Sequence, residues 1–195
     1  MVGSGGNVYV TTKDNGLMRS TNGGASWLKV LGAGINGGAV DQAADIEIAS
    51  NGDIYCSLGL FSNTAASTDG IYKSTNGGNA WVKLAGGLPV AGFQRIELAV
   101  APSNPNRLFA MFQHDVNLNC SGIYRSDDAG VTWVALGLPV AVGMANFCNG
   151  QAFYNLIAAV DPNDDDRVFV GGIDLFFLTM REEPGPRLPN GMEQG

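Results

Sequence analysis

The sequence predicts an all-β protein built from repeated four-stranded antiparallel sheets that stand side by side as the blades of a β-propeller. One tryptophan-containing segment recurs three times without gaps, and Trp27, Trp81 and Trp133 are 54 and 52 positions apart. Short apolar strands flank each copy, and further strand pairs lie between the copies. Gly accounts for 28 of the 195 residues, and no window shows the apolar spacing of an amphipathic helix. A repeat of about 50 residues with four strands is typical of a propeller blade.

Each copy of the tryptophan segment is predicted to be a β-hairpin, because a short apolar strand leads into it and another begins at its tryptophan. A Ser opens the turn, and an Asn or Asp two positions later can accept hydrogen bonds from nearby backbone N–H groups. A Gly supplies backbone freedom, and the tryptophan contributes much of the local apolar burial. The positions are Ser20, Asn22, Gly24 and Trp27, then Ser74, Asn76, Gly78 and Trp81, and finally Ser126, Asp128, Gly130 and Trp133.

These hairpins resemble the Asp-box, Ser-x-Asp-x-Gly-x-(Ser/Thr)-Trp, of BNR-repeat proteins. That group includes sialidases, the luminal domain of sortilin and xyloglucanase-type glycoside hydrolases. Asn22 and Asn76 stand where the motif has Asp, and Ala80 stands where it has Ser or Thr. The resemblance implies a β-propeller fold. It also implies that the Asp-box itself lies away from any active centre.

The predicted strands define blade boundaries within residues 1–176. A second strand pair lies at 45–57, 96–112 and 156–172. The blades are therefore expected at 7–31, 45–85, 96–137 and 153–176, which makes about 3.5 blades. Since propellers close with about four to eight blades, we expect a fragment of a six- to eight-bladed propeller whose remaining blades are missing from this chain. A ring of several copies is the rarer alternative.

Residues 177–195 are predicted to lie outside the propeller. A fourth hairpin is expected after Phe176, but the chain has no strand pattern there and contains Pro184-Gly185-Pro186. Back-translation, read from the third base of each codon, permits Ser-Asp-Asp-Ala-Gly-Gly-Ala-Trp at this place. We therefore hypothesise a shift of reading frame near residue 177, which resequencing of the coding DNA tests. These residues are expected to lack stable structure.

Composition and charge exclude several function classes. The net charge is −7 with a pI near 4.5, which disfavours nucleic acid binding through phosphate neutralisation. No run of about 18 apolar residues predicts membrane insertion. Residues 1–6 have neither the basic nor the apolar region of a signal peptide. We expect a secreted or cell-surface protein, whose export signal would lie upstream of this chain.

The cysteines and the acidic turn give no firm site. Cys120 and Cys148 both lie in Asn- and Gly-rich sequence, and the residues leave open whether they form a disulfide. Cys56 is interpreted as a small buried residue of a strand. The turn at 161–166 resembles the beginning of a calcium loop but lacks its later Gly and Glu. We interpret it as a solvated turn and predict no metal site and no cofactor.

Candidate catalytic residues are sparse, and we leave the catalytic set unknown. His114 is the only histidine, so the chain cannot build a His-based metal site of several histidines, and we interpret His114 as a loop residue. Glycoside hydrolysis needs paired carboxylates. The aspartates early in blades are Asp45, Asp69, Asp115 and Asp174, and none lies in a recognisable catalytic motif. Among the arginines Arg95 is the least explained by the repeat, but one arginine is not the triad that a sialidase uses.

The sequence therefore favours a secreted or cell-surface binding and scaffold module that engages protein or glycan, without enzyme activity. The connections at 59–69, 113–121 and 139–155 are long enough to carry specificity, and the last contains Phe147, Phe153 and Tyr154. The alternative is a fragment of a xyloglucanase-like glycoside hydrolase. A weaker alternative is an assembly factor of photosynthetic organisms.

Overall fold

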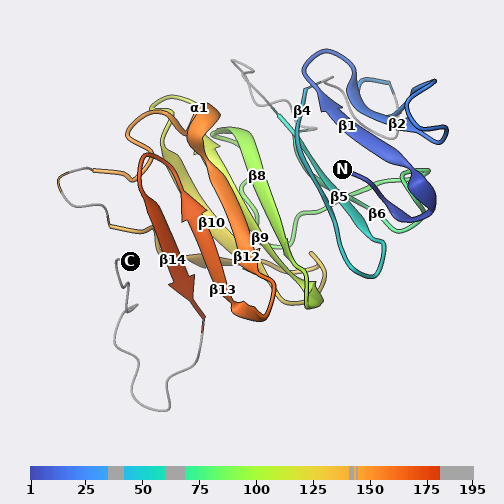
Figure 1. The fold of residues 1–195 in the computed structure, drawn as a ribbon. Helices are drawn as coiled ribbons and strands as arrows, with labels where there is room; N and C mark the ends of the chain where they lie inside the picture. The colour runs from blue at the N-terminus through green and yellow to red at the C-terminus, as the bar shows by residue number, and fades with distance from the viewer. Residues whose placement is uncertain (35–41, 60–68, 141–142, 144, 181–195) are drawn as a thin grey trace.

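A computed structural model describes residues 1–34, 42–59, 69–140, 143 and 145–180. The chain forms four antiparallel sheets, which we call blades 1 to 4 in sequence order (Figure 1). Blade 1 contains β1 (Val8–Thr12), β2 (Gly16–Ser20) and β3 (Leu28–Leu31). Blade 2 contains β4 (Ala43–Ile48), β5 (Ile54–Leu58), β6 (Gly70–Ser74) and β7 (Val82–Lys83). Blade 3 contains β8 (Phe93–Ala101), β9 (Asn104–His114), β10 (Cys120–Ser126) and β11 (Val134–Leu136). Blade 4 contains β12 (Ile157–Asp161), β13 (Asp164–Gly171) and β14 (Leu175–Thr179).

Every blade is a meander in which consecutive strands pair, and the fold class predicted from the sequence is confirmed. The first strand of blade 3 (β8) contacts the first strands of blades 2 and 4 (β4 and β12), and the three form the inner side of the array. Blade 1 begins with the equivalent of a second strand, and the Tyr9 N–H donates to the Met1 carbonyl at 2.9 Å beside it. The short elements η1 (Ser4–Gly6) and α1 (Ala152–Asn155) are the helices of the described residues.

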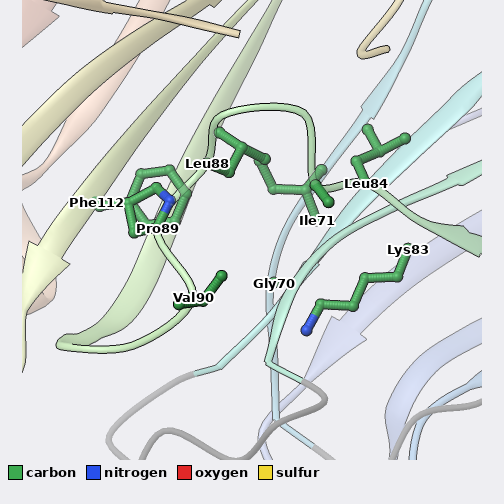
Figure 2. Close-up of a pocket in the computed structure, with 9 residues that line it drawn as sticks. Gly70, Ile71, Lys83, Leu84, Leu88, Pro89, Val90 and Phe112 are labelled. Carbon is green, nitrogen blue, oxygen red and sulfur yellow. The ribbon is translucent and has the colours of Figure 1, made fainter. Parts of the chain in front are cut away.

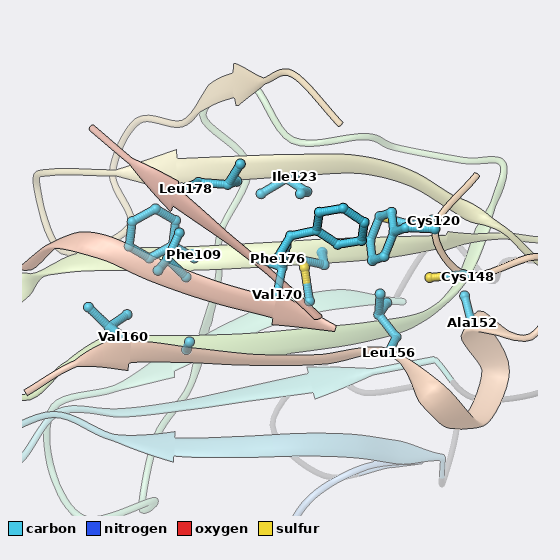
Figure 3. Packing of buried hydrophobic residues seen from close by; sticks show 14 of the residues in the cluster. Phe109, Cys120, Ile123, Cys148, Ala152, Leu156, Val160, Val170, Phe176 and Leu178 are labelled. Atoms are coloured by element: carbon cyan, nitrogen blue, oxygen red, sulfur yellow. The ribbon is translucent and has the colours of Figure 1, made fainter. Parts of the chain in front are cut away.

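Apolar side chains fill the spaces between the blades. One buried cluster joins blades 1 and 2, a second joins blades 2 and 3, and a third joins blades 3 and 4 (Figure 3). The hairpin tryptophans of blades 2 and 3 pack on the preceding blade, so Trp81 and Trp133 are only 9% and 5% exposed. Trp27 is 41% exposed, because no described blade precedes blade 1.

The three hairpins share one hydrogen-bond pattern, which explains the predicted residues. In the first, the Ser20 hydroxyl accepts the Gly24 N–H at 2.8 Å and donates to Asn22 Oδ1 at 2.9 Å. Asn22 Oδ1 also accepts the Ser26 N–H at 2.9 Å. The same bonds recur around Ser74 and Ser126, including Gly78 and Gly130 N–H groups at 2.9 Å from the Ser oxygen. An Asn therefore replaces Asp in the turn without loss of the acceptor.

The residue before the hairpin Gly adopts a left-handed backbone conformation. Gly23 and Gly77 have φ of 69°, whereas the third hairpin places Ala129 there with φ of 58°. A side chain in this region is strained by about 1–2 kcal/mol. We expect Ala129→Gly to raise the free energy of unfolding by about 0.5–1 kcal/mol, after the entropy that Gly adds to the unfolded chain. Urea denaturation measures this change.

Ala80→Gly is the matched control for that substitution. Ala80 lies in the second hairpin and has no positive φ, so the same exchange there relieves no strain. It is expected to leave stability unchanged or lower it slightly. Equal stabilisation by the two substitutions would contradict the strain argument.

The end of blade 4 corrects one prediction. We expected no strand after Phe176, but β14 continues to Thr179. Phe177 pairs with Phe169 and Leu178 with Val168, and the Leu178 side chain is buried in the cluster between blades 3 and 4. The prediction failed because we judged this segment by the missing hairpin motif, although its first residues still alternate between buried and exposed positions. Residues 181–195, and with them most of the proposed frame-shifted segment, lie outside the described part of the chain.

The three cysteines are buried free thiols. Cys56 lies in β5, as interpreted from the sequence. Cys120 and Cys148 belong to the same cluster between blades 3 and 4, but the structure does not contain the disulfide left open above. The Cys120 thiol points instead to the Gly122 carbonyl at 3.7 Å. Burial raises the pKa of Cys120 to about 12 and that of Cys148 to about 11, so both are protonated near neutral pH.

Candidate binding site

The alternation of strand direction sorts the connections onto two ends of the blades. The turns between first and second strands and the tryptophan hairpins lie at one end, which we call the turn face. The connections between blades, and those between second and third strands, lie at the other end, which we call the loop face. In Figure 1 the loop face is marked by α1 at the top, and the β12–β13 turn lies at the bottom. The described ends of the long connections predicted to carry specificity therefore lie at the loop face; residues 60–68, 141, 142 and 144 are outside the described part.

The four aspartates singled out from the sequence belong to strands or connections near the loop face. Asp45 lies in β4, Asp69 just before β6, Asp115 just after β9 and Asp174 just before β14. His114 ends β9, and its Nδ1 accepts the Val116 N–H at 3.0 Å, a contact local to its loop. The structure brings Asp45 together with Arg95, whereas Asp115 lies beside its neighbour His114, with 3.2 Å between Oδ1 and Nδ1.

Asp45 joins the inner strands of blades 2 and 3. Its Oδ2 accepts the Leu98 N–H at 2.8 Å, and its Oδ1 accepts the Ile46 N–H at 2.7 Å. The neighbouring residues of both strands are apolar and fill the interfaces between blades, so the polar residues alternate with them along the inner strands. Burial raises the pKa of Asp45, while the two backbone bonds and Arg95 act in the opposite direction.

Three further charged residues lie close to Asp45. Arg95 and Glu97 of β8 form an ion pair with 2.5 Å between Nη2 and Oε2, and Arg95 Nη1 also donates to the Ala152 carbonyl at 3.3 Å. Glu97 accepts the backbone N–H of Ala158 in β12, which links blade 3 to blade 4. Glu47 follows Asp45 by two positions in β4. We call Asp45, Glu47, Arg95 and Glu97 the inner-strand cluster.

The inner-strand cluster holds more carboxylates than cations, and this excess of negative charge raises the proton affinity of the carboxylates. Burial, followed by repulsion from Asp45 and Glu97, raises the pKa of Glu47 to about 7. Burial and repulsion from Asp45 likewise raise the pKa of Glu97 to about 7, against the attraction of Arg95. Carboxyl groups with such pKa values can donate or accept protons near neutral pH. They can also form directed hydrogen bonds to a hydroxyl-rich ligand.

Sequence reasoning found Asp45 and Arg95 but missed Glu47 and Glu97. The signal was present, because Asp45 and Glu97 each lie 36 positions before a hairpin tryptophan and so place a carboxylate at the same position of two blades. A carboxylate that recurs between apolar residues of an inner strand indicates a polar centre near the axis.

An aromatic pair on the loop face directly follows, along the chain, a residue that contacts the cluster. Ala152, whose carbonyl accepts Arg95, begins α1, and Phe153 and Tyr154 follow it. Their rings meet edge to face with centroids 4.7 Å apart, and Tyr154 is 59% exposed. Phe147, which we also considered for ligand contact, is fully buried against Phe176 and belongs to the core.

A small cavity of about 220 Å³ lies between blades 2 and 3 (Figure 2). Its walls are mostly apolar and include Ile71, Leu88, Val90 and Phe112, with Lys83 as the charged member. Burial lowers the pKa of Lys83. The cavity is smaller than the roughly 300–1,000 Å³ of typical ligand pockets, and we do not assign it the main site.

The acidic turn of blade 4 is engaged by an arginine. Oxygen atoms of Asp164, Asp165 and Asp166 lie within 4.8 Å of one another. Arg107 of blade 3 contacts Asp166, approaches Asp165 at 3.6 Å and pairs with Asp127 at 2.9 Å. The turn thus connects the turn faces of blades 3 and 4 through Arg107.

Within the described residues, no helix has the length and apolar character needed to cross a membrane. No family model matches the chain. No curated protein matches its sequence either.

Solved structures nevertheless resemble the chain. The GH74 xyloglucanase from Xanthomonas campestris aligns over 94% of this chain and 27% of its own, with 22% identity and a TM-score of 0.61. The GH74 enzyme of Niastella koreensis aligns over 90% of this chain and 27% of its own, with 16% identity and a TM-score of 0.67. A variant of the NanB sialidase from Streptococcus pneumoniae aligns over 91% and 27%, with 14% identity and a TM-score of 0.51.

These identities show a shared fold, and the chain spans only about a quarter of the length of each of the three proteins. The repeated sheets, the interfaces between them and these similarities agree with one another. The chain is therefore an all-β protein made of β-propeller blades.

Proposed function

We propose that this chain is part of an exported or cell-surface propeller that binds glycans on its loop face. The observation that carries the proposal is the inner-strand cluster, which contacts α1 through the Ala152 carbonyl, together with the exposed Tyr154 of the same helix. Carboxylates and a guanidinium provide directed hydrogen bonds for sugar hydroxyls, and an exposed aromatic ring provides a face on which a sugar ring can stack. The similarity to structures named xyloglucanase and sialidase supports glycans as the ligand class.

We further propose that the three hairpins are Asp-boxes and that the propeller contains blades beyond the four described here. The Ser, Asn or Asp, Gly and Trp residues share their hydrogen bonds and all lie at the turn face, opposite the proposed site. The exposed Trp27 supports a further blade next to blade 1. The hairpins then serve the scaffold, and the loop face serves binding.

Glycan binding is tested by calorimetric titration of the chain with xyloglucan oligosaccharides and with sialylated glycans. Tyr154→Ala is expected to weaken binding about tenfold, because it removes a stacking surface worth about 1–1.5 kcal/mol. Since Tyr154 is largely exposed, the substitution should leave the unfolding midpoint nearly unchanged. Val131→Ala, at an exposed position of the third hairpin on the turn face, is the control and should bind normally. Equal affinity of the Tyr154→Ala variant and the unaltered chain would contradict the proposed site.

Glycoside hydrolysis is the second candidate, and the high pKa of Glu47 and Glu97 favours it. A carboxyl group that stays protonated near neutral pH can serve as the general acid of this reaction. If the chain hydrolyses xyloglucan, Glu97→Gln is expected to lower the rate about 10²–10⁴-fold while binding persists. Release of reducing sugar ends from xyloglucan measures this rate of hydrolysis. Binding without any release would leave the binding module as the function.

A further inference from the structure

We infer that the free face of blade 1 docks one further blade, which carries a tyrosine on its second strand and a lysine or arginine on its third strand. The inference rests on the proposal that the described blades belong to a larger propeller. It specifies the chemistry of the missing neighbour. The free face comprises Val10, Gly23, Gly24 and Trp27.

The interface between blades 1 and 2 and the interface between blades 2 and 3 each contain a tryptophan hairpin. In both, a tyrosine and a cation of one blade donate to the hairpin of the next. Tyr9 of blade 1 donates its hydroxyl to the Gly77 carbonyl of blade 2 at 3.0 Å, and the Arg19 guanidinium donates to the same carbonyl. Arg19 also donates to Asn79 Oδ1 at 2.8 Å. One blade thus holds the hairpin of the next by a hydroxyl and a cation.

Blades 2 and 3 repeat this arrangement. Tyr55 donates to the Ala129 carbonyl at 3.3 Å, and Lys73 donates to the same carbonyl at 3.2 Å. Tyr9 pairs with Arg19 across its sheet, and Tyr55 pairs with Lys73, so the donors occupy equivalent positions. We call this pair of donors on a hairpin carbonyl the tyrosine–cation latch.

Blade 1 presents the receiving half of the latch. Gly23 has the same φ of 69° as Gly77, and Gly23 is exposed. Val10 is 41% exposed, whereas its equivalents Cys56, Ala110 and Val170 are fully buried against a preceding blade. The exposed Trp27 side chain lies on the same face. Each of these positions is buried or bonded wherever a preceding blade is present.

A second copy of this chain lacks the matching donors. At the latch positions blade 4 carries Phe169 and Phe177, which pair with each other in the sheet. Their rings lie 6.5 Å apart, and neither side chain can donate a hydrogen bond. Head-to-tail association of two copies would therefore place apolar rings against the hairpin carbonyl. The neighbour that fits is a blade of the repeat with the donors of blades 1 and 2.

The test adds such a blade to the intact chain. Residues 43–92, which contain blade 2 and the connection that follows it, are fused ahead of Met1. The tryptophans are labelled with 5-fluorotryptophan, and the Trp27 signal is assigned from Trp27→Phe. We expect the fusion to protect Trp27 from a soluble paramagnetic probe as well as Trp133 is protected. We also expect exchange of the Gly24 amide to slow about tenfold.

Two matched fusions make the outcome specific. In one, only the added copy carries Tyr55→Phe and Lys73→Met, which keeps its apolar face and removes the latch. In the other, the added segment is residues 152–180 of blade 4. Both are expected to leave Trp27 and the Gly24 amide close to their state in the chain alone, while an unchanged Trp133 signal reports that the chain remains folded.

Three results would overturn the inference. The first is an exposed Trp27 in the fusion with unaltered blade 2. The second is equal protection by the fusion that lacks the latch donors. The third is protection of Trp27 in the unfused chain that grows with concentration as a dimer forms, because the occupant would then be a second copy. None of them depends on glycan binding, so failure here is distinguishable from failure of the proposed function.

Discussion

Trp133→Ala is expected to lower the free energy of unfolding by about 3–5 kcal/mol. The indole ring is 5% exposed and packs between blades 2 and 3, so truncation leaves a cavity that the surrounding strands cannot close. Its Nε1 also donates to the Gly130 carbonyl at 3.1 Å, and the truncation leaves that acceptor without its partner. Urea denaturation followed by far-ultraviolet circular dichroism measures the change without relying on tryptophan fluorescence.

Trp27→Ala provides the comparison, because it removes the same side chain from the same position of the repeat. Trp27 is 41% exposed and lies on the free face of blade 1. We expect a loss of about 1 kcal/mol or less in this chain. If the two substitutions destabilised the chain equally, the tryptophans would owe their effect to the hairpin alone and not to packing between blades.

The chain is expected to gain stability on acidification from pH 8 to pH 5. Glu47 and Glu97 have pKa values near 7 in the folded state and ordinary values near 4.5 when unfolded. The folded state therefore binds more protons between these two values, and the free energy of unfolding rises as the pH falls through 7. After allowance for partial exposure and for the coupling of the two groups, we expect a gain of about 2 kcal/mol.

Gln substitutions assign this pH dependence to the inner-strand cluster. Glu97→Gln retains an acceptor for the Ala158 N–H but cannot titrate, and Glu47→Gln removes the second titrating group. In the doubly substituted chain, the free energy of unfolding should lose most of its dependence on pH between pH 5 and pH 8. A slope that survives both substitutions would place the responsible groups elsewhere.

The hairpins were predictable because everything that forms them is local. Ser126, Asp128, Gly130 and Thr132 bond to one another within seven residues, so their spacing alone specifies the turn. The fold class followed from repetition of that unit, since an apolar strand pair on each side can be buried only against neighbouring copies. The short strand at 177–179 escaped prediction because it lacks the turn that would have marked it.

The candidate site was predictable only in part, because its members come from different blades. Asp45 meets the Leu98 N–H across 53 positions of the sequence, and no local pattern specifies which inner strands adjoin. The cations of the latch were visible as repeat positions, since Arg19 and Lys73 directly precede the first and second hairpins. Their acceptors were not visible, because a backbone carbonyl leaves no mark in a sequence.

The tyrosine–cation latch gives the array a direction. In both latches the donors come from one blade and the accepting carbonyl from the blade that follows it, as from Tyr55 to Ala129. Blades joined in this way cannot be reversed or shuffled end for end without placing donor against donor. Insertion of a further unit that carries both donors and the hairpin preserves this direction, so an array of such blades can lengthen over evolution without a change of chemistry at its latched junctions.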